Sequence, residues 1–257
     1  MRVLSSAQNP LLQRVRRLAH EPGAYRALGQ VWVEGEHLCE ALFMRGWSAE
    51  TAVLSDSGAG VPRLLALAVR ARQTVRVPDA LYTRFSGLPA PAGIGMLVTW
   101  QPNTQPLQAV PSVVLDRLQD AGNVGSVLRS ASALGFKQVL ALKGTAGLWS
   151  PKVLRAGMGA QFGLTLHEGL EEAALDMLAA LPLPLVAASP HAAQTLGRSP
   201  LPWPCAWVFG HEGQGLAAAL RVRCASEVSI PQPGGEESLN VAAAAAVCLY
   251  ESVRTRG

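Results

Sequence analysis

A guanidinium and a carboxamide follow a predicted strand in LDRLQDAGNVGSVLR, residues 115–129. We expect Asn123 to cap a helix there, Gly125 to allow close backbone approach, and Arg129 to lie about one and a half turns along that helix. An arginine holds anions through several N–H donors, so the segment is a candidate ligand site. An ordinary strand, turn and helix with a surface arginine explains it as well when it is taken alone.

Three glycines surround one acid in WVFGHEGQGL, residues 207–216: Gly210, Gly213 and Gly215. Glycines are costly in backbone entropy, which is expected where the main chain bends sharply or touches a ligand. Their spacing, Gly-x-x-Gly-x-Gly, differs from the dinucleotide-binding fingerprint. The turn and its Glu212 are therefore candidates for a ligand pocket, and a glycine-rich connection with an incidental acid is the simpler alternative.

A small-residue helix is predicted after a Pro-Gly-Gly turn in SIPQPGGEESLNVAAAAAVCLYE, residues 229–251. We expect Ser238 to cap this helix and Asn240 to fall in its first turn, where both can satisfy backbone donors and do nothing more. The alanines at 242–246 indicate a helix that packs closely on its own sheet or on a partner subunit.

Alternating strand and helix patterns organise the second half of the chain. Apolar strands separated by helices predict an α/β fold with a mostly parallel sheet covered on both faces. Ligands bind such sheets at the carboxyl ends of the strands, where the three segments lie. The predicted strands are 112–115, 138–142, 183–187, 205–209 and 227–230, and the predicted helices are near 123–135, 151–160, 171–180, 215–221 and 238–252.

The stretch TWQPNTQPLQAVP, residues 99–111, holds three prolines and separates two ordered-looking regions. We therefore expect a small α/β domain at 1–98, a linker at 99–111 and a second domain at 112–257. The first domain is predicted to contain helices at 10–20, 37–45 and 62–72, and strands at 31–34, 52–55, 74–77 and 95–100.

The charge of the chain is concentrated at its N-terminal side. The net charge is +4, and residues 1–98 hold 11 Arg against 7 acids while the remainder is balanced. Arginine pairs with phosphate oxygens through two hydrogen bonds, so a segment that faces a polyanion is one interpretation and a solvated helix face is the other. The candidates for this contact are Arg14, Arg16, Arg17 and Arg26.

The composition excludes several other classes of protein. The longest apolar run, 241–249, is shorter than the roughly 20 residues that cross a bilayer, and the N-terminus does not resemble a secretory leader. The four cysteines form no Cys-x-x-Cys pair, and we expect four buried thiols rather than a zinc site. We therefore expect a cytoplasmic protein without a membrane segment or a metal.

In this order the three segments resemble the motifs of the SpoU (TrmH-like) ribose methyltransferases of the SPOUT class. The resemblance covers residues 112–252, and SSAQNPLLQRVRRL with VWVEGEHLCEAL is similar to the substrate-binding domain that often precedes this catalytic domain. Ala121, His211 and Met158 stand where proline, asparagine and serine are common. The matching residues are Asn123, Gly125 and Arg129; Gly210, Glu212, Gly213 and Gly215; and Ile230, Pro231, Ser238, Leu239 and Asn240.

The resemblance implies a knotted catalytic domain that binds S-adenosylmethionine, requires no metal and forms a homodimer. Arg129 would be the catalytic residue, and because arginine stays protonated at neutral pH we expect it to bind phosphate and stabilise the alkoxide rather than act as a base. Positioning would fall to Asn123, Glu212, Ser238 and Asn240. The implied cofactor residues are Phe209, Gly210, Glu212, Gly213, Ile230, Ser238 and Leu239.

The substrate that we expect is structured RNA, with ribosomal RNA favoured over tRNA because an N-terminal domain of this kind suits it. Three alternatives stay open: a tRNA 2'-O-methyltransferase, a SPOUT enzyme that methylates a base nitrogen, and an inactive RNA-binding assembly factor.

Overall fold

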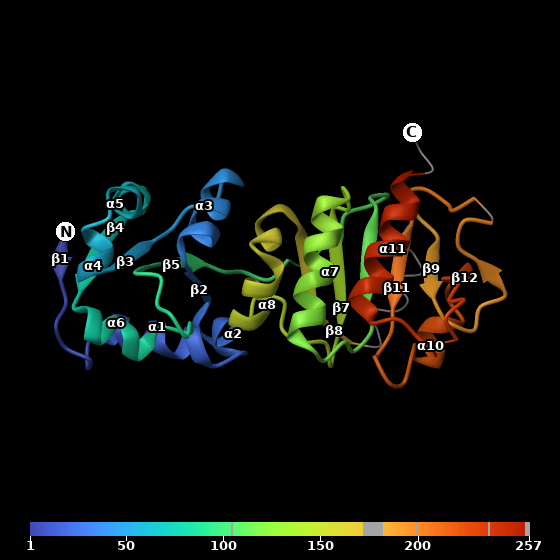
Figure 1. Ribbon diagram of the computed structural model, residues 1–257, viewed down its shortest axis with the longest axis horizontal. Coiled ribbons are helices and arrows are strands. Elements are labelled where there is room, and N and C mark those ends of the chain that lie inside the picture. The colour runs from blue at the N-terminus through green and yellow to red at the C-terminus, as the bar shows by residue number, and fades with distance from the viewer. Residues whose placement is uncertain (104, 172–181, 199, 236, 255–257) are drawn as a thin grey trace. The chain divides into compact units, whose positions relative to one another are not determined.

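The computed structural model describes residues 1–103, 105–171, 182–198, 200–235 and 237–254. The chain forms two compact units, one made of Met1–Gln101 with Trp149–Phe162 and one made of Pro102–Leu148 with Gly163–Gly257 (Figure 1). The first boundary falls inside the expected linker at 99–111. The segment 149–162, which the sequence analysis assigned to the second domain, packs with the first unit.

The first unit is built on a five-stranded mixed sheet of order β1-β4-β3-β5-β2. Strand β5 pairs antiparallel with both β2 and β3, and β3 pairs parallel with β4. Its elements are β1 (Arg2–Val3), α1 (Pro10–His20), α2 (Ala24–Leu28), β2 (Gln30–Glu34), α3 (Glu36–Met44), β3 (Thr51–Ser55), α4 (Asp56–Ala59), α5 (Pro62–Ala68), β4 (Gln73–Val77), α6 (Asp79–Phe85), β5 (Ile94–Thr99) and α8 (Pro151–Gly157), followed by a 3-10 turn at Ala160–Gly163.

Helix α1 shows how local sequence sets the basic face of this unit. Pro10 occupies the first turn, and the side chain of Asn9 accepts a hydrogen bond of 3.0 Å from the backbone N–H of Leu11. Leu12, Val15, Leu18 and Ala19 are buried at helical spacing. The arginines between them are therefore directed to solvent.

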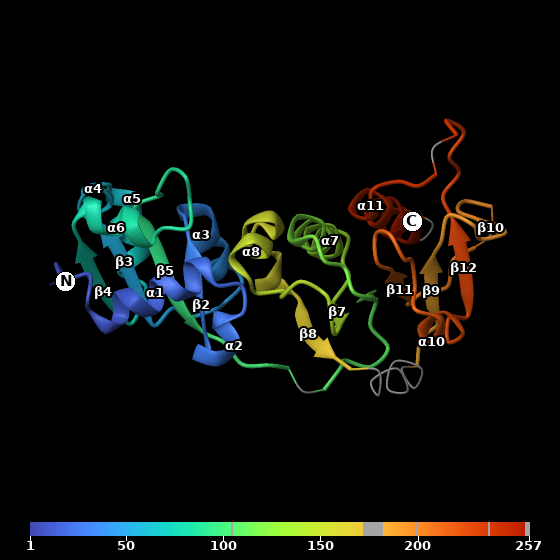
Figure 2. The same ribbon diagram turned by 90° about the horizontal axis from the view of Figure 1, so that it is seen from below.

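The second unit contains a seven-stranded sheet of order β10-β12-β9-β11-β6-β7-β8, and all of its strand pairs are parallel (Figures 1 and 2). Helices α7 and α11 lie side by side on one face of it. Its elements are β6 (Ser112–Leu115), α7 (Ala121–Ala133), β7 (Gln138–Leu142), β8 (Thr165–Leu170), β9 (Leu185–Ala188), β10 (Gln194–Thr195), β11 (Ala206–Phe209), α10 (Ala218–Arg221), β12 (Ser226–Ser229) and α11 (Val241–Arg254).

The centre of this sheet is formed by β11, which is buried along its whole length between β9 and β6. Trp207 is fully buried, and its indole N–H donates a hydrogen bond of 2.8 Å to the hydroxyl of Ser252 on α11. This bond satisfies a polar group inside the core and fixes α11 on the sheet. The α/β architecture with a parallel sheet, predicted from the strand and helix alternation, is confirmed.

Both predicted caps in this unit were wrong. Asp120, not Asn123, caps α7, because its carboxylate accepts from the backbone N–H of Asn123 at 2.8 Å. Asn240, not Ser238, caps α11, with its side-chain oxygen 2.9 Å from the backbone nitrogen of Ala242. Each helix begins next to the nearest acceptor that can reach its free N–H groups, and both predicted cap residues lie outside that position.

The other differences are smaller. The helix predicted near 215–221 is only the short α10, and β1, α2, α4, α6, β8 and β10 had no predicted counterpart. Cys39, Cys205 and Cys248 are buried, whereas Cys224 is half-buried, and all four thiols are free. The helix predicted at 171–180 lies outside the described residues after Glu171. Within the described ranges, every helix is too short or too polar to cross a lipid bilayer.

Candidate functional site

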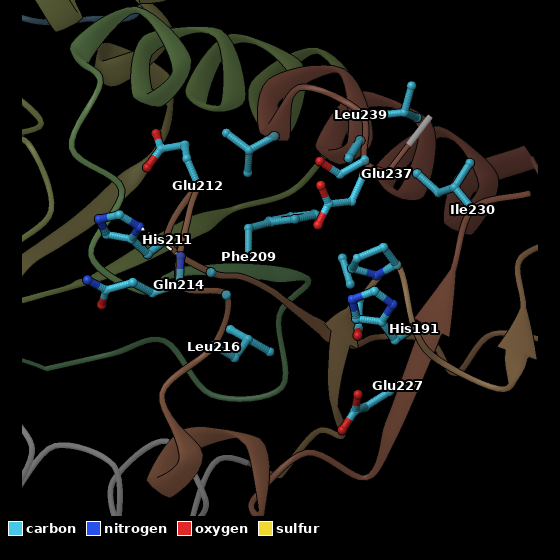
Figure 3. A pocket seen from close by; sticks show the side chains of 18 of the residues that line it. His191, Phe209, His211, Glu212, Gln214, Leu216, Glu227, Ile230, Glu237 and Leu239 are labelled. Atoms are coloured by element: carbon cyan, nitrogen blue, oxygen red, sulfur yellow. Dashed lines mark hydrogen bonds between the residues drawn. The ribbon is translucent and has the colours of Figure 1, made fainter. Parts of the chain in front are cut away.

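A cavity of about 540 Å³ opens at the carboxyl ends of β9, β11 and β12 in the second unit (Figure 3). Its walls come from the loops that follow these strands and from the start of α11. In a parallel sheet these strand ends share one edge, so residues far apart in sequence meet there. The residues predicted to bind a cofactor all line it: Phe209, Gly210, Glu212, Gly213, Ile230, Ser238 and Leu239.

The glycines after β11 have different structural reasons. A Cβ on Gly210 would lie 2.5 Å from the carbonyl carbon of Gly215, because His211 and Gly215 exchange two backbone hydrogen bonds of 3.1 and 2.9 Å that fold the loop back on itself. Gly215 adopts a φ of 65°, which favours glycine. Gly213 is not crowded, since a Cβ there would only reach the His211 ring at 3.9 Å. Gly210 and Gly215 are thus required by the turn itself.

A chain of side-chain hydrogen bonds joins the three segments. The amide of Asn123 donates to the carboxylate of Glu212 at 3.3 Å, and the amide of Asn240 donates to the side-chain oxygen of Asn123 at 3.0 Å. Asn240 also caps α11. The start of α7, the loop after β11 and the start of α11 are therefore fixed to one another through three polar side chains.

The carboxylate of Glu212 is held in its charged form. Burial alone would raise its pKa, but hydrogen bonds from its own backbone, the Asn123 amide and the backbone of Gln119 and Asp120 outweigh burial and lower the pKa below the ordinary value. Glu212 therefore accepts hydrogen bonds from donors at the N-terminus of α7. The dipole of a helix favours a negative charge at that end.

A second connection between the loops was missed by the sequence analysis. Asp116, only 1% exposed, pairs with Arg117 at 2.7 Å and accepts from the backbone N–H of Ala217 at 2.7 Å. Arg117 in turn donates to the side chain of Gln214 at 3.1 Å. Arg117 adopts a φ of 58°, a left-handed conformation that is costly for this residue type. The position of Asp116 directly after a predicted strand could have identified it as a residue of this connection.

Arg129 lies on the exposed side of α7 and does not line the cavity. Six residues separate it from Asn123, which corresponds to about 9 Å along the helix axis. Among the described residues, no hydrogen bond or ion pair to its guanidinium is formed. Within one chain, the structure brings Asn123, Glu212 and Asn240 together and leaves Arg129 outside the group.

The four arginines predicted to bind RNA are exposed in the first unit. Three of them have partners within the protein: Arg14 donates to Gln30 at 3.2 Å, Arg17 pairs with Glu21 at 3.2 Å, and Arg26 lies over the ring of Tyr25. Arg16 has none among the described residues.

Further residues of the cavity were not predicted. Ser189 and His191 follow β9, Gln232 follows β12, and Glu237 precedes Ser238. In Figure 3 the side chains of His191, Phe209 and Glu237 are drawn around the same space. The position of Ser189 and His191 directly after a predicted strand would have identified them. Among the described residues, no three His, Cys, Asp or Glu side chains are grouped so that they could hold a metal ion.

One polar atom of the cavity wall has no partner among the residues that the structure describes. The side-chain oxygen of Gln232 is buried and accepts no hydrogen bond from any of them. A buried acceptor without a donor is costly, about 1–3 kcal/mol, and a ligand with an N–H or O–H group removes that cost.

Comparison with known proteins gives a consistent result. Residues 111–250 match the SpoU rRNA Methylase family. A tRNA/rRNA methyltransferase of Synechocystis, itself described as uncharacterised, is 33% identical over 98% of this chain and 93% of its own length. The 23S rRNA (uridine(2479)-2'-O)-methyltransferase of Streptomyces viridochromogenes is 28% identical over 98% of this chain and 92% of its own.

Solved structures are similar along nearly the whole chain. The crystal structure of an RNA 2'-O ribose methyltransferase has a TM-score of 0.81 and 31% identity, and covers 99% of both chains. The SpoU methyltransferase AviRb from Streptomyces viridochromogenes, in complex with the cofactor AdoMet, has a TM-score of 0.86 and 25% identity, and covers 97% of this chain and 98% of its own. Both units of this chain are therefore included in the likeness.

Proposed function

Since the chain belongs to the SpoU rRNA methylase family, we propose that it transfers the methyl group of S-adenosylmethionine to a ribose 2'-hydroxyl of RNA. It is an RNA 2'-O-methyltransferase, and S-adenosylmethionine is its cofactor. The observation that carries this function is that two of the family's three motif segments line one cavity, while Asn123 of the third is hydrogen-bonded to Glu212 and Asn240 of the other two.

The cavity fits S-adenosylmethionine. Its volume of about 540 Å³ is within the range of small-molecule sites. The unpaired oxygen of Gln232 would accept a hydrogen bond from an N–H group of the cofactor. Because Gly213 has no side chain, the main chain of its loop is accessible to the cofactor. The bound cofactor supplies a methyl carbon on a sulfonium, which reacts with an oxygen brought into line with it.

The side chains of this protein would then perform three tasks. The bonded group of Asn123, Glu212 and Asn240 positions the loops around the cofactor, with Ser238 at the cavity wall beside them. Arg129 binds the phosphate next to the reacting ribose and stabilises the negative charge that develops on its oxygen. The loops exclude water from the methyl donor.

A homodimer completes this proposal. Arg129 is exposed and lies outside the cavity of its own chain, and α11 exposes the apolar side chains of Val247 and Tyr250. A second copy that packs on α11 would bury this surface. Arg129 of one copy would then lie near the cavity of the other copy. Light scattering that reports a mass of twice 27.0 kDa is expected, and a monomer at micromolar concentration would contradict the dimer.

We further propose that the C-terminal segments pass through a knot, as the family resemblance implies. The apolar runs of the sequence are short, and we propose that the protein acts in the cytoplasm. Knotting would be tested by a crystal structure of the C-terminal unit.

Ribosomal RNA is the substrate that we favour. The likeness to the 23S rRNA methyltransferase of Streptomyces viridochromogenes covers 98% of this chain and so includes the first unit, whereas the similar structure that concerns methylation of C/U34 on tRNA covers only 56%. A first unit with excess arginine suits a large, folded RNA.

The direct test uses purified protein, tritiated S-adenosylmethionine, and separate fractions of deproteinised 23S RNA, 16S RNA and tRNA. We expect label in 23S RNA, and mass spectrometry of the digested nucleosides should place it on ribose. Label in a base would identify a different SPOUT activity, and label in tRNA would identify the other substrate class. An assembly factor without activity would transfer no label and need not bind the cofactor in calorimetry.

A further inference from the structure

A groove in the first unit lies between α1 and α6, two helices that pack against each other. Its volume is about 390 Å³, and Arg16 from α1 and Arg84 from α6 line it. Both arginines are exposed, and neither forms an ion pair or hydrogen bond with any described residue. Two cations without internal partners thus border one groove.

Other arginines of the same unit are neutralised by acids. Arg17 pairs with Glu21, Arg63 with Glu36 at 2.9 Å, and Arg76 with Asp56. The residues that line the groove include no acid. Two like charges at one groove create a positive potential there, which an anionic ligand would neutralise.

The remaining lining residues define the ligand more closely. The floor is apolar and consists of Leu12, Leu81 and Phe85. At the rim, the side-chain oxygen of Gln8 accepts from Gln13 at 3.0 Å, so the amide N–H groups of Gln8 are left to donate elsewhere. The groove therefore offers guanidinium and amide donors beside an apolar surface, which suits a phosphate group attached to a sugar and base.

We infer that this groove binds a phosphodiester of the substrate RNA between Arg16 and Arg84. The inference rests on the proposed function, because it names the part of the protein that holds the RNA. The charge of the region supports RNA as the source of the phosphate, since residues 1–98 hold 11 Arg and 7 acids. Bidentate pairing with phosphate oxygens needs two free guanidinium donors, and Arg16 and Arg84, which have no partner among the described residues, can offer them.

The test measures binding of deproteinised bacterial 23S ribosomal RNA to the full chain as a function of salt concentration. Each phosphate contact contributes slightly less than one unit to the slope of log K against log salt. Removal of both contacts in R16A/R84A should therefore reduce the slope by about one unit per arginine and weaken binding about tenfold or more at moderate salt. The double variant R16K/R84K keeps the charges and should retain most of the slope.

The matched control is R45A/R72A, which removes two other exposed arginines of the same unit whose side chains have no ion pair or hydrogen bond among the described residues. It lowers the net charge equally but does not touch the groove, so its slope should change less than that of R16A/R84A. Equal effects of the two double variants would overturn the inference, as would an unchanged slope in R16A/R84A, the result expected if the groove served an acidic peptide. Thermal unfolding must show that all variants are folded.

The function and the groove can fail separately. Calorimetry with S-adenosylmethionine should give the wild-type affinity for R16A/R84A. The slope of log K against log salt could fall in R16A/R84A while the wild type transfers no methyl group. That result would refute the proposed function and support RNA binding at the groove. Methyl transfer with normal KM for RNA in R16A/R84A would support the function and refute the groove.

Discussion

The groove of the first unit and the cavity of the second are bordered by charged side chains in different states. In the first unit, Arg16 and Arg84 have no partner among the described residues and face solvent. In the second, buried Asp116 holds Arg117, and Arg221 pairs with Glu227 beside the cavity. Unpaired cations are suited to a polyanion that arrives from solution, whereas paired charges fix loops whose geometry must be precise. If the groove and the cavity have the proposed roles, unpaired arginines of the first unit contribute to RNA affinity, and paired charges of the second unit hold the loops that carry out methyl transfer.

The largest expected effect is the loss of methyl transfer in R129A. If Arg129 stabilises the developing alkoxide, kcat should fall by about 100- to 1,000-fold, with R129K intermediate because it keeps the charge. Affinity for S-adenosylmethionine should be unchanged in calorimetry. The control is R198A, which removes another exposed arginine of the same unit. A kcat of R129A equal to that of the wild type would show that Arg129 does not take part in methyl transfer.

The next largest effect is expected for G210A, in the loop that follows β11. In G210A the new Cβ would meet the Gly215 carbonyl carbon at 2.5 Å, so the loop must shift. We expect a loss of about 1–3 kcal/mol in the free energy of unfolding, measured by denaturant titration, together with weaker cofactor binding. G213A is the matched control, since its Cβ has no contact closer than 3.9 Å. Equal stabilities of the two variants would contradict this account.

A smaller effect is expected at Gln232. In Q232M the side chain cannot accept a hydrogen bond, so the affinity for S-adenosylmethionine should fall by roughly two- to tenfold, corresponding to about 0.5–1.5 kcal/mol. The affinity of the first unit for RNA should not change. Tighter cofactor binding by Q232M would show that the buried oxygen of Gln232 has no donor in the complex.

The smallest effect concerns acid stability. The fold lowers the pKa of Glu212 from its ordinary value of 4.5, so its stabilising contribution is present above that value and is lost as the pH falls through the lowered one. The decrease in Tm between pH 7 and pH 3 should therefore be greater for the wild type than for E212Q. E40Q, in the first unit, serves as the control. Identical decreases in Tm for the wild type and E212Q would show that the charge of Glu212 does not stabilise the connection between the loops.

The sequence was most informative where local patterns are strong. Helix α1 was predicted with its observed bounds, since Pro10 and the spacing of its buried residues define a helix without tertiary help. Strands β6 and β7 were also predicted as observed, because short apolar runs between turns identify buried parallel strands. The caps failed, since several polar residues stand near each helix start and only the fold selects the one that binds.

By itself, the sequence determined the α/β class, the three segments that follow strands and the excess of arginine in residues 1–98. Only the tertiary structure decided that β11 lies between β9 and β6, which brings Asn123 within bonding distance of Glu212 and Asn240, residues 89 and 117 positions away. It also decided which arginines have partners. Strand order and side-chain pairing depend on contacts between distant parts of the chain, and local sequence patterns do not encode such contacts.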